Sequence, residues 1–274
     1  MNGVPWLAFE GDIASILQVY QQPLSALSRG DLPAFILRRA FDPAHCKGLV
    51  DRFYRQGLLY DPRIGSNEDV PRIDIGTSLV NQCEDMDQFF ALAESTHTLF
   101  TSLFDGYENP VDFIYTTLSS LAPKKRVVVA REPDGRQYGP AIFRTYYKGV
   151  GHPPHFDSAR KREQLSALQV ARFDKQFAGV LCLQEADSDG NYAQTLLYNC
   201  QWASELSPQL PRFRSYAEEH GIERVSIALH PGDFYLFCTE TIHEMPAISG
   251  DQPRVVLACF FGFSEEDEEI YVWS

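Results

Sequence analysis

The second half of the sequence is divided into short runs of β-branched and aromatic residues separated by turn residues, and this limits the possible folds most strongly. A series of this kind predicts many short strands, as in a β-sandwich or a barrel. A helix is expected at 208–220, where Gly221 supplies the residue type that commonly ends helices. The predicted strands are 126–130, 141–147, 179–183, 195–198, 225–229, 234–238 and 255–263.

The first half of the chain instead has apolar residues at helical spacing. One helix is expected to begin after Asp42, because an Asp followed by Pro43 combines a side-chain cap with a proline at the first helical position. The short apolar run 35–37 is expected to form a strand. The other predicted helices are 12–28, 85–103 and 111–121.

No internal repeat, low-complexity tract or long Gly/Ser linker divides the 274 residues. This length lies within the range that single β-rich domains reach. We therefore expect one domain over 1–274, with a mainly helical part at about 1–122 and a β-rich core at about 123–274.

The formal net charge of −13 argues against nucleic acid and anionic membranes as partners, since both require clustered Lys and Arg. An anionic small molecule would need a local cation. The six cysteines are scattered without a C-x-x-C pair, which indicates reduced thiols. The sequence contains no signal-peptide pattern and no apolar run long enough to span a membrane, so we expect a soluble, cytoplasmic protein.

The segment 151–158 contains His155 and Asp157, which are two residues apart. On extended backbone, side chains at this spacing project from the same face, so an imidazole and a carboxylate can meet at one metal ion. An H-x-D triplet is also common by chance. By itself it is better explained as a surface turn after Pro153 and Pro154.

A third ligand is expected downstream, where His220, His230 and His243 are available. His220 lies at the end of the helix predicted over 208–220, and a histidine at this position is explained by capping. His230 directly precedes Pro-Gly-Asp, which is typical of a turn. His243, which follows the strand predicted over 234–238 after a short polar loop, is therefore the preferred third ligand.

Arg254 strengthens the choice of His243, because it follows that histidine and begins an apolar strand. An arginine entering such a strand is costly unless an anion pairs with it. A guanidinium binds a carboxylate through two parallel hydrogen bonds, so a dicarboxylate ligand would fit. The alternative is a structural ion pair with one of the acidic residues.

Two imidazoles and one carboxylate on one face of a metal ion leave other positions open, which suits iron(II) oxygenases. The same ligand types also serve zinc hydrolases. These enzymes need an activated water and a separate base, and the sequence contains no H-E-x-x-H motif or equivalent. The residues favour iron over zinc.

Taken together, His155-x-Asp157, the segment Leu229-His-Pro-Gly-Asp-Phe-Tyr-Leu-Phe237 and His243 with Arg254 resemble the signature of iron(II)/2-oxoglutarate dioxygenases. The C-terminal sequence from Arg254 to Ser274, together with 137–144 and 35–38, is similar to the carrier-independent iron halogenases of hapalindole and welwitindolinone biosynthesis. The resemblance implies an α+β fold, in which a double-stranded β-helix (jelly-roll, cupin-like) core is flanked by helices mainly from the N-terminal half.

The resemblance also implies the chemistry. It predicts iron(II) held by His155, Asp157 and His243, with O2 and 2-oxoglutarate as cosubstrates, Arg254 binding the 2-oxoglutarate carboxylate, and succinate and CO2 as products. The halogenases have a small residue in place of the carboxylate, which leaves a position for chloride. Because this sequence retains Asp157, it predicts hydroxylation of an unactivated C–H bond.

The expected substrate is a free small molecule, a natural-product intermediate by analogy with the halogenases. The alternatives are a free or modified amino acid as the substrate, desaturation or ring closure by the same iron chemistry, and a cupin-like binding module without catalytic activity. Arg144 is expected to bind the cosubstrate or to contact the substrate, with an outward-facing arginine as the alternative. Substrate contacts are expected in 74–80.

Overall fold

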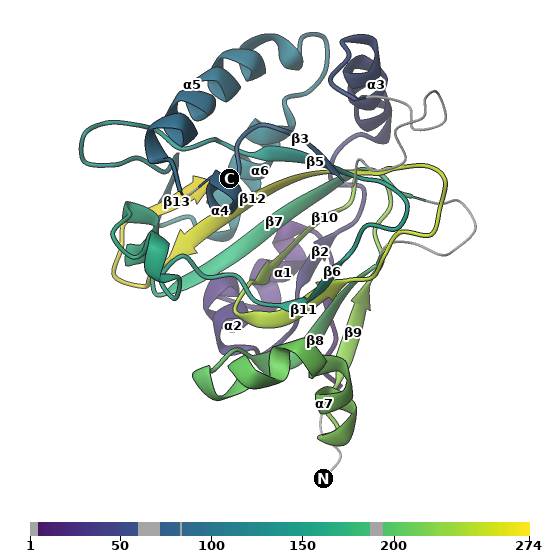
Figure 1. Ribbon diagram of the computed structural model, residues 1–274, viewed down its shortest axis with the longest axis vertical. Coiled ribbons are helices and arrows are strands. Elements are labelled where there is room, and N and C mark those ends of the chain that lie inside the picture. Colours follow the sequence, from purple (N-terminus) through teal and green to yellow (C-terminus); the bar gives the residue numbers. More distant parts are fainter. Residues whose placement is uncertain (1–4, 60–71, 83, 187–193) are drawn as a thin grey trace.

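The computed structural model describes residues 5–59, 72–82, 84–186 and 194–274. Within these residues, the backbone forms a large sheet and a smaller one (Figure 1). In the large sheet the strand order is β1-β2-β10-β7-β12-β13-β4, and β5 pairs with β12 and with β3. The order in the small sheet is β6-β11-β8-β9.

The strands of the large sheet are β1 (Phe9–Glu10), β2 (Phe35–Leu37), β3 (Arg72–Ile75), β4 (Arg126–Val129), β5 (Ile142–Tyr146), β7 (Lys175–Gln184), β10 (Phe234–Cys238), β12 (Arg254–Phe263) and β13 (Glu269–Trp273). Those of the small sheet are β6 (His152–His155), β8 (Thr195–Gln201), β9 (Arg224–Ile227) and β11 (Thr241–Met245).

The α-helices are α1 (Ile13–Val19), α2 (Pro23–Arg29), α3 (Pro43–Arg55), α4 (Leu79–Gln82), α5 (Met86–Leu103), α6 (Pro110–Leu121) and α7 (Phe213–Glu219). Shorter 3₁₀ segments occupy Glu163–Leu165, Gln169–Arg172 and Ser204–Arg212.

Side-chain alternation along the strands divides the large sheet into two faces with different roles. On β12, Val255 and Leu257 point to the main hydrophobic core, whereas Arg254 and Val256 line a cavity on the other face. The same alternation on β5 sends Phe143 to the core. The period of two residues thus explains how one strand supplies both core residues and cavity residues.

The main core lies between the large sheet and the helices α1, α2, α3, α5 and α6. Phe143 is at its centre and is fully buried. Its ring centroid is 4.8 Å from that of Phe53 on α3 and 5.8 Å from that of Phe100 on α5. These edge-to-face contacts fix α3 and α5 over the sheet, and Figure 1 shows both helices along one side of the molecule.

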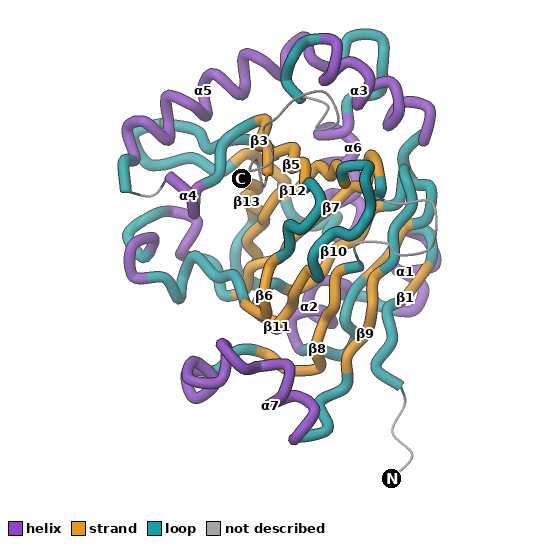
Figure 2. Tube along the Cα trace, turned by 45° about the vertical axis from the view of Figure 1, so that its right-hand side comes forward, coloured by secondary structure: helices purple, strands orange, loops and turns teal. Residues whose placement is uncertain are grey.

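The small sheet covers the opposite face of the large one (Figure 2). Buried residues from both sheets pack together here, including Ile36 and Tyr235 of the large sheet and Leu197 and Ile227 of the small one. Two facing sheets with outer helices form the double-stranded β-helix fold, so the fold class that the sequence predicted is confirmed.

Several expected elements are confirmed with their caps. The Asp42 carboxylate accepts a hydrogen bond from the backbone N–H of Ala44 at the start of α3, with Pro43 at the first helical position. Asp85 caps α5 in the same way through the N–H of Gln88. The predicted strands over 126–130, 141–147, 179–183, 195–198, 225–229, 234–238 and 255–263 all appear, with shifts at their ends.

The single helix expected over 12–28 is wrong, because the structure has α1 and α2 with a break between them. Pro23 explains the break, since proline disfavours helical backbone at the residue before it and cannot donate the helical hydrogen bond. The helix expected over 208–220 is also only partly present. It begins as the 3₁₀ segment containing Pro208 and Pro211, and becomes α-helical at Phe213.

Two strands that the sequence did not predict, β6 and β11, lie side by side in the small sheet. Just before β6, the backbone at Gly151 passes close to β11. A Cβ atom at this position would lie 2.7 Å from the Met245 carbonyl oxygen. A glycine is therefore required where the chain enters β6. No helix among the described residues is both long enough and apolar enough to cross a membrane.

Candidate metal centre

His155 and His243 lie directly opposite each other on the antiparallel strands β6 and β11. Their ring centroids are 4.2 Å apart. Asp157, two residues after His155, points to the same place, and one potential ligand atom from each of the three residues lies within 4.8 Å of the others. The structure thus brings together the three residues that the sequence predicted as metal ligands.

Hydrogen bonds to the backbone orient both imidazoles. Nδ1 of His155 is 2.7 Å from the Pro153 carbonyl oxygen, and Nδ1 of His243 is 2.8 Å from the Thr241 carbonyl oxygen. A carbonyl oxygen can only accept, so each Nδ1 carries the proton and each Nε2 presents a lone pair. The two Nε2 atoms face the Asp157 Oδ2 oxygen at 3.7 and 3.6 Å. These donors fit a divalent metal ion.

The protonation states also suit metal binding. Burial, with a contribution from nearby His243, lowers the pKa of His155 to about 4, so this imidazole is neutral near pH 7. Burial by itself would raise the pKa of the Asp157 carboxyl. The contact with His243, followed by the nearby His155 and Arg162, outweighs this effect and holds the pKa below its usual range. Neutral imidazole and ionised carboxylate are the forms that coordinate metals.

The two oxygens of the Asp157 carboxylate have different neighbours. Oδ2 faces the histidines, whereas Oδ1 accepts a hydrogen bond from Nη2 of Arg162 at 3.1 Å. Arg162 lies in the loop after β6, and no motif in the sequence identified it. Its position next to Asp157 becomes visible only when the loop is folded.

Arg254 is buried, with 3% of its surface exposed, and lines the same cavity. Its Nη1 lies 3.1 Å from the sulfur of Met245, which is two residues beyond His243 on β11. On the other side, its Nε lies 3.6 Å from Oε2 of Glu185. This distance is too long for a hydrogen bond, and neither atom has a hydrogen-bond partner among the described residues. Arg254 therefore has an ion-pair neighbour and retains unused donor capacity.

The cavity in front of these residues has a volume of about 320 Å³. This volume is at the lower end of the range for small-molecule sites. Its walls are mainly apolar, with contributions from Val180 of β7, Phe237 of β10 and Val256 of β12. Ser78 and Val80 also line the cavity. Both belong to the segment 74–80, in which the sequence predicted contacts with a substrate.

Arg144 also reaches the cavity, and the outward-facing alternative is therefore wrong for this residue. It lies on β5, opposite Val256 of β12, which places it diagonally across from Arg254. Its Nη2 is 3.4 Å from the Ser78 hydroxyl oxygen, and its buried Nε has no hydrogen-bond partner among the described residues. His152 lines the cavity as well, with its ring centroid 5.8 Å from that of His155.

The other histidines considered as ligands have different surroundings. His220 terminates α7, and its Nδ1 lies 2.9 Å from the Tyr216 carbonyl oxygen, so its expected capping position is confirmed. The backbone N–H of His230 donates to the carboxylate of Asp233 in the expected turn. Neither residue belongs to the group around Asp157.

Glu244 is a buried carboxylate beside the site that the sequence did not single out. It follows His243 on β11 and is 1% exposed. The hydroxyl of Tyr198 donates to its Oε1 at 2.5 Å, and Arg214 of α7 contacts its Oε2 at 2.5 Å. This network connects β11 to β8 and α7, and so supports the strand that carries His243.

Comparisons with known proteins agree with the fold. Among solved structures, an N-substituted L-amino acid dioxygenase from Burkholderia ambifaria AMMD in complex with alpha-KG shares the fold, with 15% identity, a TM-score of 0.57, and 92% of this chain and 90% of that chain covered. A second structure of this enzyme gives a TM-score of 0.54 at the same identity and coverage. No curated protein sequence matches significantly.

A family model described as carrier-protein-independent halogenase WelO5 matches residues 6–274. The match covers almost the whole chain, including both strands that carry the histidines and the strand that begins at Arg254. The protein therefore belongs to the family of the carrier-protein-independent halogenase WelO5.

Proposed function

We propose that this protein is an iron(II)/2-oxoglutarate-dependent hydroxylase of a free small molecule, a natural-product intermediate. The observation that carries the proposal is that His155, Asp157 and His243 meet in the same cavity as Arg254. When bound, iron and 2-oxoglutarate supply O2 activation coupled to oxidative decarboxylation, which releases succinate and CO2.

Arg254 is placed to bind the distal carboxylate of 2-oxoglutarate. Met245 contacts Arg254 and is two residues from His243 on β11, a separation of roughly 6.6 Å along a strand. A short diacid with one end at His155, Asp157 and His243 can extend over this distance, so its other carboxylate can reach Arg254. Arg254 has the donor geometry for a carboxylate, and its apolar surroundings exclude water that would weaken the pairing.

Arg144 is proposed to contribute to the same cosubstrate site. Arg144 lies on the neighbouring strand β5, two residue pairs further along β12 than Arg254. The pairing with Ser78 at 3.4 Å leaves its Nε without a partner among the described residues. A buried guanidinium in this state is stabilised by an anionic ligand.

Asp157 supports hydroxylation over halogenation. The halogenases that the sequence resembles have a small residue at this position, which leaves room for chloride. Here the Asp157 carboxylate lies between the two imidazoles and carries a negative charge. It would occupy the halide position and repel an incoming anion.

The test is an anaerobic titration of the metal-free protein with iron(II) and 2-oxoglutarate. The visible charge-transfer band of the iron chelate is expected with the wild type and not with His243→Ala. Substrate-dependent release of succinate, measured over a set of candidate metabolites by mass spectrometry, then tests turnover. Failure of the wild type to develop the band would contradict the proposal. A band without succinate release for any candidate would instead favour a binding module.

A further inference from the structure

We propose that Arg162 is a positioning residue that holds Asp157 as a ligand through one oxygen only. This inference rests on the proposed function, because it has meaning only if His155, Asp157 and His243 bind a metal ion. It goes beyond that function by assigning a role to a residue outside the ligand set.

The two Asp157 oxygens have separate partners. Arg162 donates to Oδ1 at 3.1 Å, while the Nε2 atoms of His243 and His155 lie 3.6 and 3.7 Å from Oδ2. A carboxylate without such a donor can rotate and bind a metal through both oxygens. With Oδ1 engaged by Arg162, it occupies one coordination position, and the remaining positions stay available to other ligands.

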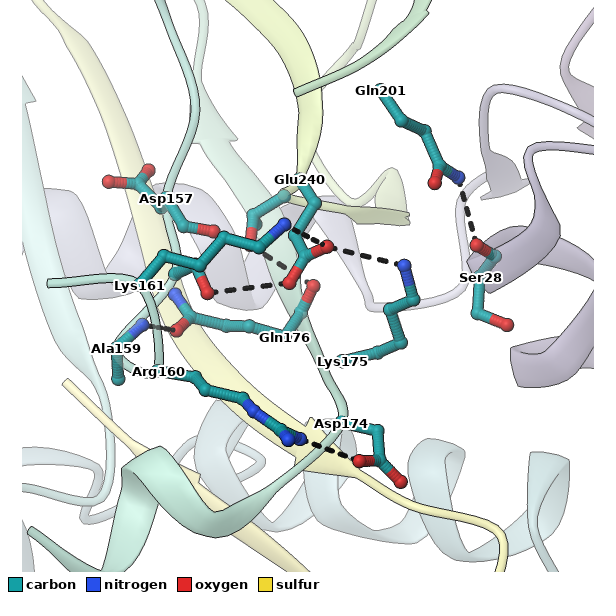
Figure 3. Close-up of polar contacts among 12 residues, drawn as sticks. Ser28, Asp157, Ala159, Arg160, Lys161, Asp174, Lys175, Gln176, Gln201 and Glu240 are labelled. Carbon is teal, nitrogen blue, oxygen red and sulfur yellow. Dashed lines mark hydrogen bonds and ion pairs between the residues drawn. The ribbon is translucent and has the colours of Figure 1, made fainter. Parts of the chain in front are cut away.

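The loop that carries Arg162 is anchored by its neighbour Lys161. Nζ of Lys161 lies 2.8 Å from Oε2 of Glu240, a buried carboxylate at the turn between β10 and β11. Lys175 at the start of β7 contacts the same oxygen at 3.2 Å, and Ser158 donates to Oε1 at 3.3 Å. Figure 3 shows Lys161 and Lys175 converging on Glu240.

The backbone of Asp157 is attached to the same turn. Its N–H donates to the Thr239 carbonyl oxygen at 2.9 Å, and the Thr239 hydroxyl donates to the Asp157 carbonyl oxygen at 2.8 Å. The side chain of Gln176 accepts from the N–H of Ala159 at 2.7 Å. Asp157 and the loop with Arg162 are thus both attached to the turn between β10 and β11.

A positioning role and a purely electrostatic role have opposite consequences for metal affinity. A nearby cation repels a divalent metal ion, so its removal would tighten binding if charge were its only contribution. Loss of a hydrogen-bond partner that orients a ligand typically weakens metal binding by about 10–100-fold. The sign of the change therefore distinguishes the two roles.

The experiment is titration of the metal-free protein with Co(II), followed by calorimetry and by visible absorption, without substrate or turnover. Arg162→Gln and Arg162→Met should both weaken Co(II) binding by about 10-fold or more. Their Co(II) absorption bands should also change, because the carboxylate is then free to bind through two oxygens. Arg160→Gln is the matched control: Arg160 lies in the same loop and pairs with Asp174 on the surface at 2.6 Å.

Wild-type affinity or tighter binding in both Arg162 variants, with unchanged Co(II) spectra, would overturn the proposal. Circular dichroism verifies that the variants are folded, and the two substitutions provide independent tests should one of them fail to fold. If the wild type and His155→Ala bind Co(II) equally weakly, the proposed function itself fails. If the wild type binds Co(II) tightly and the Arg162 variants bind it equally tightly, only the positioning role of Arg162 is rejected.

Discussion

His155 and His243 are register partners on the antiparallel strands β6 and β11, and each ring is oriented by a hydrogen bond from Nδ1 to a backbone carbonyl two residues earlier. The backbone of this strand pair therefore sets the positions of both Nε2 atoms. A hydrogen bond of this kind fixes the tautomer and the orientation of the ring. The following predictions test the site and its support.

Replacing Arg254 by Lys should raise the KM for 2-oxoglutarate while leaving metal affinity unchanged. A lysine retains the charge but loses the paired geometry, and a hydrogen bond to a charged group contributes about 1.5–3 kcal/mol, or roughly 10–100-fold in affinity. The measurement is succinate formation against 2-oxoglutarate concentration, with Co(II) titration alongside. Glu185→Gln, which removes the neighbouring carboxylate, should have a smaller effect on KM. An unchanged KM for Arg254→Lys would argue for a purely structural ion pair.

Replacing Asp157 by Gly should abolish hydroxylation and weaken metal binding, because a coordinating carboxylate is lost. The loss of affinity should be at least as large as the roughly 10–100-fold seen when only a partner of a ligand is removed. Product analysis by mass spectrometry and Co(II) titration measure both effects. Asp174→Gly is a suitable control, since Asp174 is an exposed acidic residue paired with Arg160. Full hydroxylase activity of Asp157→Gly would show that Asp157 is not a ligand.

Replacing Glu244 by Gln should destabilise the protein by about 1–3 kcal/mol, because the buried carboxylate accepts hydrogen bonds from Tyr198 and Arg214. Urea denaturation at pH 7 measures the change. Arg214→Gln should cost less than this, since the Arg214 side chain is 59% exposed. The same unfolding midpoint for wild type and Glu244→Gln would mean that this network does not stabilise the small sheet.

Replacing Phe143 by Ala should lower the free energy of unfolding by about 3–5 kcal/mol, as expected for a fully buried phenylalanine. The Phe143 ring contacts Phe53 of α3 and Phe100 of α5. Its removal would leave an empty space between these two helices and the large sheet. Leu7→Ala is the control, because Leu7 is 62% exposed and should change stability by less than about 0.5 kcal/mol. Equal stability losses in both variants would contradict the packing argument.

The buried cysteines should resist alkylation in the native protein. Burial raises the pKa of Cys46 and of Cys259 to about 12, so very little reactive thiolate is present at pH 8. Cys200 is more accessible, although burial also raises its pKa, and it should react first of these three as the pH is raised from 7 to 9. Iodoacetamide labelling followed by peptide mass spectrometry measures the order. Rapid native labelling of Cys46 would contradict it. Cys83 lies outside the described residues.

The sequence by itself determined the residues of the candidate site that depend on local spacing. His155 and Asp157 share a face because they are two residues apart on extended backbone, and Arg254 faces the cavity because it begins a strand whose alternate residues enter the core. The caps at Asp42 and Asp85 were equally predictable, because a cap is a contact within a few residues.

Tertiary structure alone decided what depends on contacts between distant segments. Strand β6 contains Pro153 and Pro154, after which the sequence suggested a surface turn. It is nevertheless the edge strand of the small sheet and needs pairing only with β11. The same holds for Asp157, the proposed metal ligand. Its local spacing predicted the face it points to, but the partner of its second oxygen, Arg162, was decided by a loop anchored through Lys161 to the distant Glu240. Contacts of this kind arise only when the chain is folded, because they depend on segments whose sequences contain no mutual signal.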